Sequence, residues 1–262
     1  MSETIAVGEG AARREIAVLR RPGGEPGLFW LGGFRSEMTG NKAMTLDAYG
    51  ARRGFAVTRF DYSGHGQSGG DFYDGTISRW LEDALAVFAT TTGKQVVVGS
   101  SMGGWMALLL VRALRAMGDD RVGSLILIAP AVDMTEDLML KTFTRKQKKD
   151  LADFGVVMEP SEYGDPYPLT RGLIEDGANH LLFGRGITTG CPINILQGAA
   201  DRDVPKEHAL KLVQHILTDP VTFTLVPDGD HRLSREQDLL LLEKTLDRAV
   251  DEAVPPQLTL GI

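Results

Sequence analysis

Ser101 lies at the centre of residues 99–103 (Gly-Ser-Ser-Met-Gly), a G-x-S-x-G pattern. The β-branched run at 95–98 predicts a buried strand before it, and apolar residues at helical spacing over 102–117 predict an amphipathic helix after it. A serine at such a junction sits on a tight turn, with its hydroxyl at the positive end of the helix. The pattern favours a nucleophilic serine, although a glycine-rich turn with an incidental serine has the same letters.

Two later loops carry the groups that a serine nucleophile needs. A serine hydroxyl requires a histidine base, and the histidine requires an acid that fixes its tautomer. Asp201 and Asp203 follow the predicted strand at 193–196, and His231 follows the one at 221–226. Asp201 is favoured because it begins an Asp-x-x-Val-Pro spacing, which leaves Asp203 as a charge at a helix start. The sequence therefore predicts a Ser101, Asp201 and His231 triad.

The other four of the five histidines have simpler interpretations. His65 lies in a glycine-rich loop, where a structural hydrogen bond is expected, and His180 is a candidate substrate contact. His208 and His215 share one face of a predicted helix and are expected on its surface or in packing. No cluster of His, Cys and Asp has metal-ligand spacing, so we expect neither a metal nor a cofactor.

The predicted elements place the triad residues at one edge of a sheet. Strands are predicted at 15–19, 28–31, 56–60, 95–98, 124–128, 193–196 and 221–226, with helices between them. This alternation predicts an α/β fold with a mostly parallel, doubly wound sheet, whose functional groups lie at the carboxyl ends of the strands. Ser101, Asp201 and His231 each follow a predicted strand, in the chain order of an α/β-hydrolase.

Five segments together resemble the α/β-hydrolase superfamily over nearly the whole chain. They are the nucleophile turn at 99–103, the acid loop at 197–205, the histidine loop at 229–231, an oxyanion loop at 31–34 and a glycine loop at 61–69. Gly32 stands where the oxyanion loop of the family usually has histidine. The resemblance implies that the backbone N–H groups of Phe34 and Met102 hold the oxyanion.

A finer resemblance points to one branch of the superfamily. Residues 34–43, 75–80 and 130–139 look like those of the mitochondrial acyl-protein thioesterases, which remove palmitoyl groups and also cleave acyl glucuronides, and of their bacterial relatives. The likeness lies in loops and not in catalytic residues. It implies a small-molecule ester or thioester as substrate, with acylated protein as a further substrate class.

Residues 133–190 break the strand and helix rhythm between the expected core segments 1–132 and 191–262. No strand is predicted there, and helix-like pieces alternate with the turn-rich stretch 159–168. In the resembling enzymes this position holds a helical cap that excludes water and shapes the pocket. Apolar residues such as Met139 and Phe143 either line an acyl pocket or only pack the cap onto the core.

The cap also contains a basic run, Lys141, Arg145, Lys146, Lys148 and Lys149. A solvated helix face is the simplest interpretation. Attraction to an anionic membrane surface, at about 1 kcal/mol per charge, is the second. One of these cations, or Arg35 beside the oxyanion loop, is also a candidate partner for a substrate carboxylate or phosphate.

Composition is that of an ordinary globular enzyme. The 262 residues have 43% hydrophobic and 24% charged residues, which indicates neither disorder nor a membrane span. The net charge of −7 argues against nucleic acid as a partner. Cys191 is the single cysteine, and no signal or transit peptide is recognisable, so we expect a cytoplasmic protein. The oligomeric state is not indicated.

Together these features predict a serine hydrolase that cleaves a carboxylic ester or thioester through an acyl-enzyme. A peptidase or a carbon–carbon bond hydrolase can use the same three residues. A binding protein that kept the fold and lost turnover is the alternative from a different class.

Overall fold

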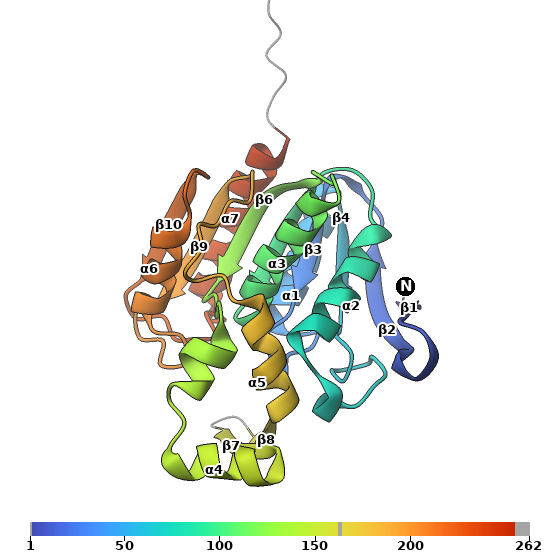
Figure 1. Cartoon of the computed structure of the whole chain (residues 1–262). Helices are drawn as coiled ribbons and strands as arrows, with labels where there is room; N and C mark the ends of the chain where they lie inside the picture. Colours follow the sequence, from blue (N-terminus) through green and yellow to red (C-terminus); the bar gives the residue numbers. More distant parts are fainter. Residues whose placement is uncertain (1, 162–163, 255–262) are drawn as a thin grey trace, which may run out of the picture.

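The computed structural model describes residues 2–161 and 164–254, and its centre is an eight-stranded sheet with helices on both faces (Figure 1). From β4 to β10 every neighbouring pair of strands is parallel, whereas β1 and β2 are antiparallel to their neighbours. In sheet order the strands are β1 (Ser2–Val7), β2 (Arg14–Arg21), β4 (Phe55–Phe60), β3 (Gly24–Leu31), β5 (Gln95–Ser100), β6 (Val122–Ile128), β9 (Ile193–Gly198) and β10 (Val221–Val226). The predicted α/β fold is confirmed, and each of the seven predicted strands is present.

Strand β1 is the one strand of this sheet that the sequence did not predict. Its residues Ser-Glu-Thr-Ile-Ala-Val begin with three polar side chains, which hide the apolar pattern of a strand. It pairs with β2 at the sheet edge, where one side of a strand has no neighbour and polar side chains are common.

Helices cover the sheet in two layers. α1 (Asn41–Arg53) and α7 (Glu236–Ala253) pack on one face, and α2 (Ile77–Ala89), α3 (Met102–Ala116) and α6 (Lys206–His215) lie on the other (Figure 1). Because successive strand residues point to opposite faces, Val97 joins the apolar core under α2 and α3, while Val96 and Val98 join the core under α1 and α7. Two short 3₁₀ turns, η1 (Gly10–Ala12) and η2 (Phe72–Asp74), interrupt the loops.

The segment between β6 and β9 lies outside the main sheet, beyond the carboxyl ends of its strands (Figure 1). We call residues 133–190 the cap. Its elements are η3 (Thr135–Leu140), α4 (Arg145–Phe154), β7 (Val156–Ser161), β8 (Gly164–Thr170), α5 (Arg171–Gly177) and η4 (Ala178–His180).

The expectation that the cap has no strand is wrong. β7 and β8 pair antiparallel as a separate two-stranded sheet. Pro160, Pro166 and Pro168 lie within these strands and make the stretch look like a loop in the sequence, yet an isolated hairpin tolerates proline because its outer edges need no ladder hydrogen bonds.

Asp133 joins the two ends of the cap. Its buried carboxylate accepts the backbone N–H groups of Leu182 and Phe183, each at 2.8 Å. Burial raises the pKa of Asp133, and these two hydrogen bonds oppose the increase because they stabilise the charged form. The chain therefore enters the cap at Asp133 and comes back to the same carboxylate at Leu182 and Phe183.

In the described part of the chain, none of the helices combines the length and the apolar character needed to cross a bilayer.

Candidate active site

Ser101 occupies a strained turn between β5 and α3. Its φ of 54° and ψ of −118° lie in a region that residues other than glycine rarely adopt. The Ser101 N–H donates to the carbonyl of Ile128 at 2.8 Å, which ties the turn to the end of β6. The turn thus holds the serine above the sheet at the amino end of α3.

Two glycines make this turn sterically feasible. A Cβ atom at Gly99 would lie 2.2 Å from the carbonyl oxygen of Gly103, and one at Gly103 would lie 2.1 Å from the carbonyl oxygen of Leu31. Both contacts are with backbone atoms, which have little freedom to move. Glycine is therefore required on both sides of Ser101 for the backbone segments to approach this closely.

The three residues of the predicted triad lie within hydrogen-bonding distance of one another in series. His231 Nε2 is 3.1 Å from Ser101 Oγ, and His231 Nδ1 is 2.9 Å from Asp201 Oδ2. Since a carboxylate only accepts, Nδ1 carries the proton and Nε2 accepts from the serine hydroxyl. The Asp201 side chain is 0% exposed, whereas that of His231 is 21% exposed. The Asp201 carboxylate is thus shielded from water, and the His231 ring is partly accessible.

The neighbouring acid, Asp203, contributes its backbone to this arrangement. Asp201 Oδ1 accepts the N–H groups of Asp203 and Val204 at 2.9 and 2.8 Å. The Asp203 side chain is exposed, with a carboxylate oxygen within 4.8 Å of the ligand atoms of Asp201 and His231. A metal ion between these three groups would displace the hydrogen bond between Asp201 and His231.

The loop that contains Phe34 lies directly against the serine. A Cβ at Gly33 would be 3.3 Å from Ser101 Cβ and 3.2 Å from the carbonyl oxygen of Ser100, so the two segments are already in contact. Met102 is the first residue of α3, where backbone N–H groups have no partner within the helix. The two expected oxyanion donors therefore belong to segments that flank Ser101.

His65 holds the loop that contains Phe34 and Arg35 by a hydrogen bond to its backbone. Its Nε2 accepts the backbone N–H of Arg35 at 3.1 Å, and its Nδ1 donates to the carbonyl of Ser63 at 3.2 Å. Burial lowers the pKa of His65 to about 4, which keeps the ring neutral. The expected structural hydrogen bond of His65 is confirmed, and it holds Arg35 in its left-handed conformation, with φ of 57°, directly after Phe34.

We expect the protonation of His65 to weaken the fold in acid. Because its pKa is about 4 when folded and 6.5 ordinarily, the unfolded chain binds a proton that the folded chain does not as the pH falls below 6.5. The loss reaches roughly 3 kcal/mol in the free energy of unfolding near pH 4. Urea denaturation at a series of pH values should show a shallower pH dependence for His65→Gln than for the unaltered protein. Equal slopes would contradict the assignment.

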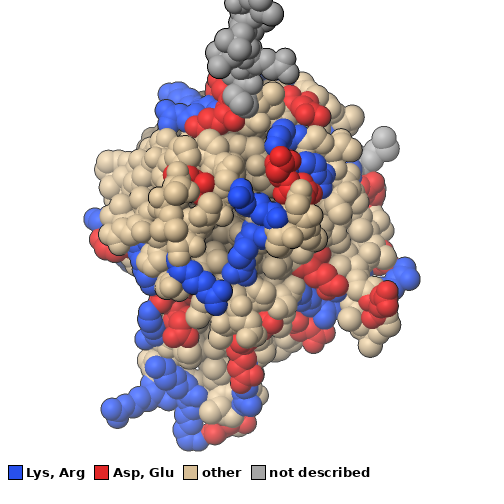
Figure 2. All heavy atoms as spheres, turned by 45° about the horizontal axis from the view of Figure 1, so that its top comes forward, with Lys and Arg blue, Asp and Glu red and all other residues tan. Residues whose placement is uncertain are grey.

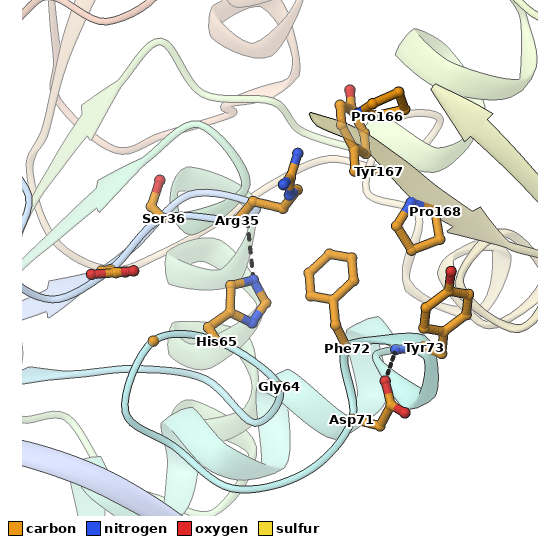
Figure 3. Close-up of a pocket in the computed structure, with 12 residues that line it drawn as sticks. Arg35, Ser36, Gly64, His65, Asp71, Phe72, Tyr73, Pro166, Tyr167 and Pro168 are labelled. Atoms are coloured by element: carbon orange, nitrogen blue, oxygen red, sulfur yellow. Dashed lines mark hydrogen bonds between the residues drawn. The ribbon is translucent and has the colours of Figure 1, made fainter. Parts of the chain in front are cut away.

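A pocket of about 350 Å³ opens beside the oxyanion loop (Figure 3). It is lined by Arg35, Ser36, Glu37, Gly64, His65, Gly66, Asp71, Phe72, Tyr73, Pro166, Tyr167 and Pro168. The core supplies the loops at 35–37, 64–66 and 71–73, and β8 of the cap supplies the Pro-Tyr-Pro wall. Ser101, Asp201 and His231 are not among the lining residues, so the pocket adjoins the triad without containing it.

Tyr167 connects the cap to the oxyanion loop. Its ring lies 5.8 Å from that of Phe34, centroid to centroid, and the guanidinium of Arg35 stacks over it at 4.8 Å. Tyr167 lines the pocket, and burial raises the pKa of its hydroxyl, with a further increase from the carboxylates of Glu159 and Asp203. Tyr167 was not predicted as a site residue because its turn-rich stretch looks like a loop in the sequence, although the Pro-Tyr-Pro triplet was the available signal.

The other expected substrate contacts have different positions. Arg35 lines the pocket, as just described, but Met139 and Phe143 do not. Phe143 is buried and Met139 partly buried, both against the main apolar core. His180 Nε2 lies 2.7 Å from Ser78 Oγ at the start of α2, outside the pocket.

The basic run lies on the surface of the cap, where Figure 2 shows Lys and Arg atoms gathered at its far end. Three of its lysines pair with acids of their own helical segments, Lys141 with Asp137, Lys146 with Asp150 and Lys149 with Asp153. Exposed pairs at this spacing contribute little to stability. None of the five residues of the run lines the pocket.

Lys42 is a second residue that no sequence pattern had indicated. Its ammonium group, at the start of α1, donates to the carbonyl of Arg232 and lies 3.5 Å from Ser234 Oγ. Burial and the charge of Arg232 lower the pKa of Lys42 to about 8. The lysine therefore tethers the loop that carries His231 to the core.

Comparisons with known proteins agree with this geometry. A family model described as serine aminopeptidase, S33, matches residues 40–171. The palmitoyl-protein thioesterase ABHD10, mitochondrial, of Bos taurus is 32% identical over 242 residues, which are 90% of this chain and 77% of that protein. A crystal structure from Agrobacterium vitis S4 is similar at a TM-score of 0.93 and 48% identity, covering 95% of this chain and 98% of that one. Alpha/beta hydrolase domain-containing protein 10 from mouse gives 0.84 and 29%, covering 96% and 100%.

Proposed function

The chain belongs to the serine aminopeptidase S33 family of α/β-hydrolases, and from this premise we propose that it cleaves carboxylic esters or thioesters through an acyl-enzyme on Ser101. The supporting observation is the series of hydrogen bonds from Ser101 through His231 to the buried Asp201. The relative that spans 90% of the chain is a palmitoyl-protein thioesterase, which supports an acyl thioester as one substrate class.

In the first step Ser101 Oγ attacks the carbonyl carbon while its proton passes to His231 Nε2. The electron pair of the carbonyl moves to oxygen, where the N–H groups of Phe34 and Met102 stabilise the charge. When the tetrahedral intermediate collapses, the alkoxide or thiolate leaves and takes the proton from His231. Asp201 keeps the Nδ1 proton on the imidazole and stabilises the imidazolium that forms in between.

In the second step water replaces the leaving group. His231 takes a proton from the water as its oxygen attacks the acyl carbon, and the same two N–H groups receive the second oxyanion. Ser101 Oγ then leaves with the proton from His231, and the carboxylic acid is released. The resting enzyme is regenerated without a cofactor in either step.

The family description names an aminopeptidase, so amide cleavage is the second candidate. An aminopeptidase has to bind the α-ammonium group of its substrate, and Glu37 and Asp71 in the pocket are acidic groups of the required sign. Asp71 already accepts the N–H of Tyr73 at 2.9 Å, and Glu37 accepts the Thr39 hydroxyl at 3.4 Å, so both acids already have a partner. The thioesterase relative matches much more of the chain than the family model does, and we therefore favour the ester or thioester.

A fluorophosphonate probe and a panel of substrates test the proposal. We expect the probe to label the protein on Ser101, and p-nitrophenyl esters and acyl thioesters of graded chain length to turn over. Amino-acid anilides in the same panel report aminopeptidase activity. An intact fold without labelling or turnover would favour a binding protein instead.

Substituting the cap residues should separate pocket lining from packing. Tyr167→Ala removes one wall of the pocket and is expected to change the ratio of kcat/KM between short and long substrates by roughly tenfold. Phe143→Ala removes a buried ring, which costs about 3–5 kcal/mol of stability and lowers all rates alike. Met139→Ala tests the expected acyl wall in the same panel. Thermal denaturation checks the stability of each variant, and unchanged selectivity in Tyr167→Ala would contradict its role.

A further inference from the structure

Gln197 is a buried amide on the strand that carries the acid loop. It lies near the end of β9, four residues before Asp201, and its side chain is inaccessible to solvent. Buried amides are uncommon because each of their polar atoms needs a partner. Gln197 therefore occupies this position at a cost that an apolar residue would avoid.

The amide nitrogen of Gln197 is surrounded by three oxygen atoms. Gln197 Nε2 lies 2.9 Å from the carbonyl oxygen of Val204, 3.0 Å from that of Gly198 and 3.2 Å from Asp201 Oδ2. Its own oxygen, Oε1, is buried with no hydrogen-bond partner among the described residues. A flipped amide would place Oε1 against three acceptors, so the neighbours fix the orientation.

This donor completes the coordination of the Asp201 carboxylate. Oδ1 accepts two backbone N–H groups, from Asp203 and Val204, and Oδ2 accepts from His231 Nδ1 and from Gln197 Nε2. A carboxylate has about four acceptor positions. Among the residues that the structure describes, donors occupy all four, and Gln197 supplies the one side-chain donor other than His231.

We propose that Gln197 is a positioning residue for the Ser101, Asp201 and His231 triad, which directs Asp201 Oδ2 at His231 Nδ1 and moderates the basicity of that oxygen. The proposal rests on the proposed function, since it needs His231 to act as a base. The geometric part follows from the two donors on Oδ2, which together set the plane of the carboxylate. The electrostatic part follows because a second hydrogen bond withdraws charge from the oxygen that faces the imidazole.

Gln197→Met tests both parts because methionine has a similar length and no N–H donor. We expect kcat to fall by roughly 10- to 100-fold, the range that corresponds to losing one hydrogen bond to a charged group, with KM little changed. The acid limb of the kcat/KM profile should move by roughly half a pH unit to higher pH, because the more basic carboxylate holds a proton on the imidazole more strongly. Asp203, the other acid near His231, is unaltered in this variant.

Asn194→Leu is the matched control. Asn194 is also a buried amide of β9 with an unpartnered oxygen, but its nitrogen donates to Glu252 at 2.8 Å, away from the triad. We expect this variant to lose thermal stability while it keeps kcat and the position of the acid limb. If Gln197→Met also loses stability but keeps kcat and the position of the acid limb, Gln197 has only a structural role and the proposal is wrong.

Gln197→Glu is the second test, for use if Gln197→Met does not fold. The protonated carboxyl group can donate to Asp201, but the ionised one repels it. We expect activity close to that of the unaltered enzyme at the same low pH, and a growing loss relative to it as the pH rises, whereas a constant ratio of the two activities would overturn the proposal. Failure of the proposed function is distinguishable, since the unaltered protein would then show neither probe labelling nor turnover.

Discussion

Replacing Ser101 with alanine should abolish ester and thioester turnover while the fold is kept. The hydroxyl is the attacking atom of the proposed reaction, and loss of a triad nucleophile elsewhere costs on the order of 10⁶ in kcat. Alanine also relieves none of the steric demands of the turn, because its Cβ meets the same φ of 54°. Initial rates with a p-nitrophenyl ester, together with circular dichroism, measure both parts of the expectation.

Ser100→Ala is the control for this result. Ser100 is the last residue of β5 and is buried, and it is not part of the hydrogen-bond series through His231. Its replacement should change the rate by less than about tenfold. If Ser100→Ala lost turnover and Ser101→Ala retained it, the nucleophile would be wrongly assigned.

Asp201→Asn should reduce kcat on the order of 10⁴-fold, the second largest effect expected. The Oδ1 position receives two backbone N–H groups, so the amide oxygen of asparagine must occupy it and the NH₂ group must face His231. His231 Nδ1 then becomes an acceptor and Nε2 carries the proton. In that tautomer Nε2 no longer accepts the proton of Ser101.

Asp203→Asn is the matched comparison, because it makes the same chemical change on an exposed neighbour. Its rate should stay within about tenfold of the unaltered enzyme, since its contact with Asp201 is through the backbone N–H. The ratio of the two variant rates is the measurement. A larger loss for Asp203→Asn would show that the acid of the triad had been misassigned.

The sequence was most informative where chemistry demands particular residues at particular places. Glycine is required on both sides of Ser101 because backbone atoms lie where a Cβ would be. A requirement of this kind leaves a pattern in the sequence, so the turn could be predicted without a structure. The parallel strands could also be predicted, since buried strands such as β5 are continuous apolar runs.

What escaped prediction depends on contacts between distant segments. Tyr167 meets Arg35 only because the β7 and β8 hairpin folds back over the core, and nothing near either residue in the chain indicates this. Lys42 and Arg232 are separated by 190 positions. The hydrogen bond between Gln197 and Asp201 is local, but a glutamine at the end of a strand has no pattern that separates it from an ordinary polar residue.

Asp133 closes most of the cap into a loop of its own. Its carboxylate binds the N–H groups of Leu182 and Phe183, so the chain that leaves the core at Asp133 returns to the same side chain about 50 residues later. The entropy lost on closing a loop grows only slowly with its length, so the cost of this closure depends little on how many residues lie between. We therefore expect variants with a longer or shorter segment between Asp133 and Leu182 to keep the strand order of the main sheet, because none of its strands lies in that segment.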